Sequence, residues 1–341
     1  MLPLLEIDDL KVHFPIGGSW LKAPRTVVHA VDGVSLQVMP GEAVAIVGES
    51  GCGKTTLARA LLGLSQPTAG SIRFKGVDLS SLHAGARARS YRREIQMVFQ
   101  DPFESLNPRK SVFQTLAQPL RIHKSVPRQE IRAEVVRLLD LVGLSPGENY
   151  LNRFPHQFSG GQRQRICIAR SIAPKPSLII ADEAVSALDI SIRAQILALM
   201  KKLQNELGLS YLFITHDLGV VRSFCDRVIV MYLGKVVEEG PTEQIFQRPR
   251  HPYTIGLLES CPLADPIVAR RRSGYLLKGD MPSPISPPKA CRFHTRCWMS
   301  QEICRTLAPP LINGGGGHSS RCHFAGESEK WPVYNFGGRV Q

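Results

Sequence analysis

The sequence predicts an α/β fold in which a parallel β-sheet presents a phosphate-binding loop, and three observations predict it. An apolar strand, Ala43–Val47, runs directly into residues 48–55, which fit the pattern G-x-x-x-x-G-K-[ST] at every fixed position. Helical periodicity follows at once in Thr56–Leu62. A second apolar strand, Leu178–Asp182, ends in two adjacent carboxylates. Strand, loop and helix in this order are the context that a phosphate-binding loop requires.

The phosphate-binding loop carries the first chemical prediction. Its glycines let the backbone turn tightly, so that successive N–H groups and the start of the next helix face a β-phosphate. Lys54 supplies a positive charge for the β- and γ-phosphate oxygens, and the Thr55 hydroxyl can bind Mg²⁺. The sequence therefore predicts binding of a nucleoside triphosphate. The residues expected to contact it are Gly48, Glu49, Ser50, Gly51, Cys52, Gly53, Lys54, Thr55 and Thr56.

Length and charge limit the classes of protein. At 341 residues the chain is long enough for two domains, and no stretch approaches 18 consecutive apolar residues. The net charge of +13 is uneven, because residues 87–175 hold 16 Lys/Arg against 7 Asp/Glu. A basic surface suits nucleic acid, an anionic membrane face or a nucleotide, and a solvated helical face explains it equally well. No aromatic RNA-binding motif accompanies the charge. Charge alone leaves the function open.

The two carboxylates after the second strand predict the metal and the base of a hydrolysis site. Asp182 stands where a P-loop ATPase holds Mg²⁺, and Glu183 stands where it can polarise the attacking water. Upstream, Phe158–Gln162 reads Phe-Ser-Gly-Gly-Gln, which predicts a second anion-binding turn before a helix that starts at Gln162. One bound triphosphate hardly needs two such turns so far apart. Two copies facing head to tail would use both.

These residues resemble the nucleotide-binding subunits of ATP-binding-cassette (ABC) transporters. Six family motifs occur in order: the Walker A loop 48–55, the Q-loop Gln100, the signature 158–162, the Walker B pair Asp182 and Glu183, the D-loop 186–189 ending in Asp189, and the switch His216. The resemblance implies a P-loop NTPase fold, with a RecA-like core, a helical subdomain and a small Cys-rich C-terminal extension. One departure is Ala184, where the family usually has proline.

The resemblance also implies a role for each residue. Mg²⁺ would bind Thr55, Gln100 and, through water, Asp182. Glu183 would activate water for in-line attack, and His216 would contact the γ-phosphate. The signature residues would close over ATP bound by a partner subunit, so that ATP holds the dimer closed. These are Ser159, Gly160, Gly161 and Gln162. The aromatic residue that stacks on adenine would be Phe14 or Trp20.

The domain organisation follows from the same reading. Residues 1–260 would form the nucleotide-binding domain, with a parallel sheet, an antiparallel region near the start, and a helical subdomain at about 101–161. Residues 261–341 would form a linker and a C-terminal extension. Within them 279–290 is too rich in proline for a helix or a central strand.

The C-terminal extension holds four of the 8 cysteines, as Cys291-x5-Cys297-x6-Cys304-x17-Cys322. The other four, Cys52, Cys167, Cys225 and Cys261, are scattered and interpreted as small buried residues. A reducing compartment disfavours disulfides, and the C-x2–4-C pair typical of structural zinc is absent. Spacing alone leaves an iron–sulfur cluster, zinc and unligated thiols open. The nearby His294, His318 and His323 are interpreted as exposed loop histidines.

The extension narrows the resemblance to ATPase subunits of dipeptide and oligopeptide importers, through His251–Thr254, the Pro-Ser-Pro segment and Cys-x5-Cys. That group implies a [4Fe-4S] cluster on the four cysteines. It also implies a second, non-identical ATPase, two permeases and a periplasmic binding protein, at the cytoplasmic face of a bacterial inner membrane. Nickel, glutathione and opine importers share the pattern. A soluble ABC ATPase acting on ribosomes or nucleic acid is the alternative of another class, but those proteins usually hold two cassettes, and no nucleic-acid partner is expected here.

Overall fold

The computed structural model describes residues 2–17, 26–79, 86–260, 277 and 279–325, so Trp20 and Cys261 fall outside the described residues. The chain divides into two compact units. The first unit comprises Asp78–Ile214 with the short segments Met1–Leu4 and Val38–Glu42. The second unit comprises Leu5–Gln37, Ala43–Val77 and Thr215–Gln341. In the described part of the chain no helix is long and apolar enough to cross a bilayer.

The first unit contains three parallel strands, β6 (Ile95–Val98), β7 (Leu178–Asp182) and β8 (Ser210–Ile214). They lie in the order β6-β7-β8. All five residues of β8 and the first four of β7 are buried, as parallel strands covered on both faces require. Register pairs Asp182 with Ile214, so the carboxylates of the Walker B pair stand at the carboxyl edge of the strands. This is the edge at which α/β proteins bind ligands.

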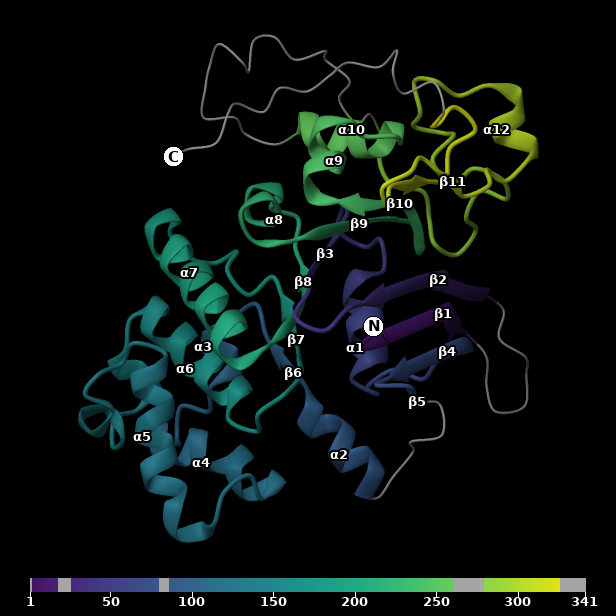
Figure 1. The fold of residues 1–341 in the computed structure, drawn as a ribbon. Coiled ribbons are helices and arrows are strands. Elements are labelled where there is room, and N and C mark those ends of the chain that lie inside the picture. Colours follow the sequence, from purple (N-terminus) through teal and green to yellow (C-terminus); the bar gives the residue numbers. More distant parts are fainter. Residues whose placement is uncertain (1, 18–25, 80–85, 261–276, 278, 326–341) are drawn as a thin grey trace. The chain divides into compact units, whose positions relative to one another are not determined.

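Helices form the rest of the first unit, and in Figure 1 α3 to α6 lie together. Residues 101–161 are helical or irregular throughout, as expected. A capping box begins α4, because Ser111 Oγ accepts from Gln114 N–H while the Gln114 side chain accepts from Ser111 N–H. The helices are α2 (Ala86–Glu94), α3 (Pro102–Ser105), α4 (Val112–His123), α5 (Ile131–Leu141), α6 (Gly160–Ile172) and α7 (Ile190–Leu207).

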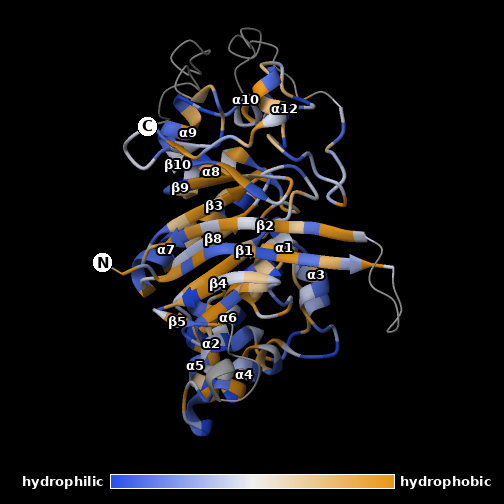
Figure 2. Ribbon diagram, turned by 90° about the vertical axis from the view of Figure 1, so that its right-hand side faces the viewer, coloured by the Kyte–Doolittle hydropathy of each residue, from blue (hydrophilic) through white to orange (hydrophobic). Residues whose placement is uncertain are grey.

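The second unit holds the expected antiparallel region. Its strands lie in the order β2-β1-β4-β5, and β1 pairs antiparallel with β4 from Leu5 opposite Phe74. Their bounds are β1 (Leu5–Ile16), β2 (Thr26–Val38), β4 (Ala69–Phe74) and β5 (Val77–Asp78). Separately, β3 (Ala43–Val47) pairs parallel with β9 (Arg227–Tyr232), and both run as largely hydrophobic ribbons in Figure 2.

The described part of the C-terminal extension docks on the antiparallel strand β10 (Lys235–Pro241), which pairs with β9. The short strand β12 (Ser319–Ser320) pairs with Glu238 and Glu239, and β11 (Ile312–Asn313) pairs with β12. Residues 279–290 contain neither helix nor strand, as predicted. The helices in the described part of this unit are α1 (Lys54–Leu61), α8 (Leu218–Phe224), α9 (Thr242–Gln247), α10 (Pro252–Glu259) and α12 (Glu302–Thr306).

Candidate nucleotide site and cysteine cluster

Two glycines of the phosphate loop stand where no other residue fits. Gly48 has φ +153°, and a Cβ added there would lie 2.2 Å from the Met231 carbonyl oxygen. Gly53 has φ +109°, and a Cβ there would lie 2.2 Å from the carbonyl oxygen of Ala30. The backbone can therefore turn from the buried strand β3 into helix α1, which begins at Lys54. The loop leaves backbone N–H groups and the start of a helix for an anion, as the sequence predicts.

Lys54 is 7% exposed and is held by the loop itself. Its Nζ donates to the carbonyl oxygens of Gly48 (2.7 Å) and Glu49 (2.9 Å) and lies 3.6 Å from Cys52 Sγ. Cys52 is buried, as expected, and burial raises the pKa of its thiol. Of the other loop residues, Ser50 and Thr55 are exposed and Thr56 is half-buried.

Glu49 contacts two residues that the sequence did not pair with the phosphate loop. Its backbone N–H donates to Tyr253 Oη at 2.8 Å. Arg296 donates to both carboxylate oxygens, from Nη1 at 2.6 Å and Nη2 at 3.0 Å. In the pattern Glu49 occupies a variable position, and Arg296 lies 247 residues away, so no local signal could have paired them. The hydrogen bond to Glu49 raises the pKa of the Arg296 guanidinium.

The Walker B carboxylates lie in the first unit. Asp182 ends β7, and the next residue, Glu183, has φ +48° while its N–H donates to the Ile214 carbonyl (2.8 Å). A glutamate in the left-handed region is uncommon, and such residues often mark functional turns. Ser186 secures the turn by donating from both N–H and Oγ to the Glu183 carbonyl. Both carboxylates are half-buried.

The signature turn also lies in the first unit. Ser159 caps α6, since its Oγ accepts from Gln162 N–H (3.3 Å) and the Gln162 side chain accepts from Ser159 N–H (3.1 Å). The helix begins at Gly160, so the expectation that it starts at Gln162 is wrong by two residues. The capping box explains the difference, because a helix begins immediately after its cap. A Cβ on Gly161 would lie 2.7 Å from Ile192 Cγ2, so helix α7 packs closely on this glycine.

The remaining predicted nucleotide residues stand at the ends of elements. Gln100 is exposed two residues after β6, and Asp189 is the exposed N-cap of α7. His216 is exposed between Thr215 and the N-cap of α8, Asp217, whose Oδ1 accepts from two N–H groups of that helix. Phe14 is 41% exposed in β1. Of the two units, the second holds the phosphate loop and His216, and the first holds Gln100, the signature, Walker B and Asp189.

The four cysteines of the extension share one neighbourhood. Burial, together with the charges of the neighbouring thiols, raises the pKa of Cys297 and of Cys322 to about 12 each. Burial also raises the pKa of Cys291. Backbone groups two residues ahead hydrogen-bond to three of the sulfurs, from Phe293, Met299 and Phe324. Such bonds commonly support metal-bound thiolates.

The thiols are not gathered around one point. Zinc at about 2.3 Å from each sulfur would bring four thiolates within about 3.8 Å of one another. Among the described residues, no three of these sulfurs all lie within 4.8 Å of one another. The other described cysteines, Cys167 and Cys225, are buried as expected.

The three histidines of the extension are not exposed, which corrects the interpretation from sequence. His318 is 4% exposed and lies 2.7 Å from Glu238 Oε1, a fully buried carboxylate on β10. His294 and His323 are half-buried and lie against the carbonyls of Cys291 and Leu307. Docking of β12 on β10 buries this region, and nothing in the local sequence reports that contact.

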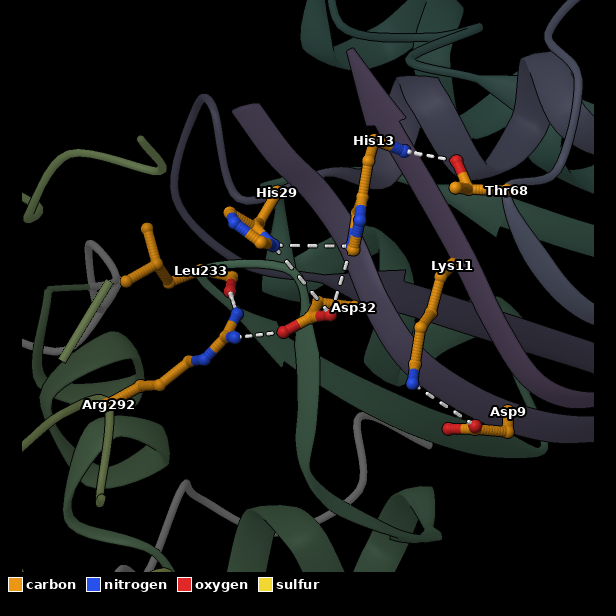
Figure 3. A network of polar contacts seen from close by, with 8 residues as sticks. All are labelled: Asp9, Lys11, His13, His29, Asp32, Thr68, Leu233 and Arg292. Atoms are coloured by element: carbon orange, nitrogen blue, oxygen red, sulfur yellow. Dashed lines mark hydrogen bonds and ion pairs between the residues drawn. The ribbon is translucent and has the colours of Figure 1, made fainter. Parts of the chain in front are cut away.

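A polar network joins the extension to β1 and β2 (Figure 3). His13 Nε2 lies 3.0 Å from Asp32 Oδ1 and 3.3 Å from His29 Nδ1. These three donor atoms lie within 4.8 Å of one another. Arg292 donates to the other carboxylate oxygen of Asp32 and to the carbonyl of Leu233. Asp32 is the single carboxylate among these three residues, and the positive charge of Arg292 compensates it. The network therefore fits a docking contact of the extension better than a cation site.

Comparisons with known proteins agree on the class. A family model described as ABC transporter matches residues 31–186, and one described as oligopeptide/dipeptide transporter, C-terminal region, matches 237–304. The chain is 48% identical over 321 residues to the oligopeptide transport ATP-binding protein AppF of Bacillus subtilis, covering 94% of this chain and 97% of AppF. It is 48% identical over 314 residues to the dipeptide transport ATP-binding protein DppF of Escherichia coli, covering 92% of each.

Solved structures resemble the chain as well. One is cbiO1 from Clostridium perfringens, part of the ABC transporter complex cbiONQ, with a TM-score of 0.61 and 29% identity. The match covers 72% of this chain and 90% of that one. Another is MJ0796, a bacterial ABC transporter cassette solved as a dimer, with a TM-score of 0.60 and 30% identity. That match covers 70% of this chain and 98% of the cassette.

Proposed function

The chain belongs to the ABC transporter ATPases, and we propose that it is the ATP-hydrolysing subunit of a bacterial importer for dipeptides or oligopeptides. The expected fold, the α/β nucleotide-binding domain of the P-loop NTPases, is that of its structural neighbours. The observation that carries the peptide assignment is the match of residues 237–304 to a transporter C-terminal region, in a chain whose phosphate loop is intact. Relatives named for oligopeptide and dipeptide transport support it.

Each residue expected at the ATP site has a proposed role. Lys54 and the loop N–H groups would bind the β- and γ-phosphates. Thr55, Gln100 and Asp182 offer hydroxyl, amide and carboxylate oxygens, the donor set that Mg²⁺ prefers. Glu183 would take the proton of the attacking water, and His216 would contact the γ-phosphate. Phe14 is the described candidate for stacking on adenine.

The signature would act on a partner's ATP. Ser159 and the first turn of α6 form a capped helix start, which favours an anion. In a head-to-tail dimer this turn and Asp189 would complete the site of a second ATPase, a non-identical one by resemblance to peptide importers. The γ-phosphate would bridge the two surfaces, and its hydrolysis would release them.

The assembly would contain two permeases and a periplasmic binding protein, with this chain at the cytoplasmic face of the inner membrane. The helical segment at about 101–161 would receive the permeases. The basic residues between Arg87 and Lys175 would lie near anionic lipid, where each contributes up to about 1 kcal/mol of attraction. We place the nucleotide-binding domain at 1–260 and the linker with the extension at 261–341.

The four cysteines would hold a [4Fe-4S] cluster. Support comes from the grouping of Cys291, Cys297, Cys304 and Cys322 and from the backbone hydrogen bonds to three of their sulfurs. Four irons at the corners of a cube spread their thiolates more widely than one zinc does, which suits sulfurs that are near one another without converging. The high pKa values of Cys297 and Cys322 imply that metal binding displaces protons.

Peptide uptake in the host of this chain tests the proposed function. Deleting its gene should abolish uptake of a labelled dipeptide or of a short oligopeptide, and the wild-type gene should restore it. A gene carrying Glu183→Gln should not. If the deletion abolishes uptake of nickel and leaves peptide uptake intact, the peptide assignment is rejected, but the assignment as an importer ATPase stands. Native mass spectrometry of the co-expressed complex tests the pair of ATPases. Two copies of this chain per permease pair would reject the non-identical partner.

A further inference from the structure

Glu49 of the phosphate loop is held at three points, and two of the contacts come from beyond residue 250. Its N–H donates to Tyr253 Oη, and its carboxylate accepts two hydrogen bonds from Arg296. Its carbonyl accepts from Lys54 Nζ at 2.9 Å. Arg296 is therefore linked through Glu49 alone to Lys54, the lysine proposed to bind the phosphates. A shift of Glu49 must move a carbonyl to which Lys54 is bonded.

Arg296 is well placed to fix Glu49. Its side chain is 5% exposed and forms a bidentate pair, the geometry that restrains a carboxylate most tightly. The guanidinium lies 5.9 Å from the ring centroid of Tyr232. Tyr232, Tyr253 and Phe293 pack on one another with centroids 4.7 to 5.4 Å apart. The same aromatic cluster thus positions Tyr253 and Arg296, the two residues beyond residue 250 that contact Glu49.

Two more contacts join the extension and the loop. The Met281 methyl would lie 3.2 Å from a Cβ on Gly51, so the Pro-rich segment covers this glycine closely. Arg292 donates to the carbonyl of Leu233, and the next residue, Gly234, donates from its N–H to the carbonyl of Cys52 at 2.8 Å. The extension therefore touches the loop at Glu49 and Gly51 directly, and at Cys52 through one turn.

We infer that residues 291–297 clamp the phosphate loop through Arg296 and thereby set the nucleotide affinity of this site. Arg296 is a positioning residue, because it acts on the phosphates through Glu49 and Lys54. It lies next to Cys297, and Arg292 lies next to Cys291, so whatever binds these thiols also fixes the clamp. The inference rests on the proposed function, in which this loop binds ATP.

A clamp of this kind is reciprocal. If the bound state of the thiols raises the affinity for nucleotide, nucleotide must stabilise the bound state of the thiols by the same factor. The structure therefore predicts an effect in both directions. Each direction can be measured without any turnover.

The first experiment measures the dissociation constant of a fluorescent ATP analogue on the purified full chain. Arg296→Ala should raise it about tenfold, within the usual range for coupled sites. Arg296→Lys should give an intermediate value, because the charge stays and the bidentate geometry is lost. Glu49→Gln combined with Arg296→Ala should be no worse than Arg296→Ala alone. The matched control is Arg305→Ala, an exposed arginine of the same extension.

Lys54→Ala distinguishes failure of the proposed ATP site from failure of the Arg296 clamp. Unchanged affinity in Lys54→Ala would defeat the proposed function itself. A weakened Lys54→Ala beside an unchanged Arg296→Ala would defeat the clamp alone. Because loss of Arg296 could unfold the extension, Arg296→Lys and the urea midpoint of every variant accompany the measurement. Equal affinity of Arg296→Lys and wild type would also reject the bidentate clamp.

The second experiment reads the reverse direction at the cysteines. Alkylation of Cys291 and Cys297 by iodoacetamide is followed by peptide mass spectrometry in the protein as purified, with and without ATP and Mg²⁺. ATP should slow alkylation severalfold in the wild type and leave it unchanged in Arg296→Ala. Cys225, a buried cysteine at the end of α8, is the internal control. The same ATP protection in Arg296→Ala as in the wild type would overturn the inference.

Discussion

Gln164 on helix α6 donates from Nε2 to the carbonyl oxygen of Ala184, 2.6 Å away, at a site where Gln164 is fully buried. Ala184 follows Glu183 directly, and Gln164 lies two residues beyond the signature residue Gln162. The bond therefore ties the helix that starts at the signature to the turn that carries the catalytic carboxylate. It lies entirely within the first unit. A change in the position of α6 would therefore act on the turn that carries Glu183.

Gln164→Leu should break this tie. The carbonyl of Ala184 loses its donor at a buried position, while the Gln164 Oε1, which has no partner among the described residues, is removed too. The two effects offset, so the free energy of unfolding should fall by only about 1 kcal/mol. ATP turnover in the assembled complex should fall more than ATP affinity. Gln195→Leu, the same change at an exposed glutamine of α7, is the control. Equal turnover in Gln164→Leu and Gln195→Leu would show that Gln164 does not couple α6 to the Glu183 turn.

The sequence predicted the elements and the motifs because their signals are local. The strand before the loop, the glycines that must turn and the carboxylates after β7 can each be read within ten residues. It could not predict the polar contacts between Arg296 and Glu49, between Gln164 and Ala184, or between His318 and Glu238. These pairs depend on which segments pack together, and their separations in the chain reach 247 residues. Periodicity places the start of α6 at Gln162, two residues late, because the capping box fixes the first turn.

Glu183→Gln should keep ATP binding and lose hydrolysis. The amide fills the same space but cannot take a proton from water, so the ATP-bound, closed dimer should accumulate. Phosphate release is measured in the assembled complex, beside the affinity of the isolated chain for ATP. Lys54→Ala is the contrasting variant, since it should weaken binding itself. Turnover near the wild-type rate in Glu183→Gln would show that Glu183 does not activate the attacking water.

Ser159→Arg should block closure on the partner's ATP and leave this chain's own nucleotide bound. A long cation would occupy the turn where the partner's γ-phosphate is proposed to sit. Because the change also removes the cap of α6, worth about 1 kcal/mol, Ser159→Asn is the control that keeps a capping side chain. Closure is measured by size-exclusion chromatography in the presence of ATP and the sister ATPase. All variants are made in the Glu183→Gln background, so that ATP is not hydrolysed. An ATP-dependent dimer in Ser159→Arg would contradict the assignment of the signature.

Anaerobically purified protein should be brown and contain about four irons per chain. Changing any one of Cys291, Cys297, Cys304 or Cys322 to serine should bleach it. Cys225→Ser should leave the colour, because that thiol lies at the end of α8 and is not among the groups whose charges act on the four cysteines. Visible absorbance and iron analysis measure the outcome, and stoichiometric zinc without iron would reject the cluster. Removing the metal should also weaken ATP binding if Arg296 clamps the loop.

The last prediction concerns His251, which is 2% exposed at the start of α10. Its Nδ1 accepts from Tyr253 N–H at 3.0 Å, so the neutral ring serves as the helix cap. Burial lowers the pKa of this imidazole to about 3, against an ordinary value of 6.5. The unfolded chain therefore binds a proton below pH 6.5 that the folded chain refuses. Stability from this group is complete above pH 6.5 and is lost as the pH falls toward 3.

His251→Asn should flatten that dependence. Asparagine keeps a capping oxygen but cannot be protonated, whereas the wild-type histidine costs about 2 kcal/mol between pH 8 and pH 5. The smaller side chain lowers stability at every pH, so the slope and not the level is the test. Urea unfolding from pH 8 to pH 5 measures it, with the exposed His156→Asn as control. If His251→Asn and wild type lose stability in parallel as the pH falls, the buried imidazole does not carry the acid sensitivity, and other titrating groups of the fold must.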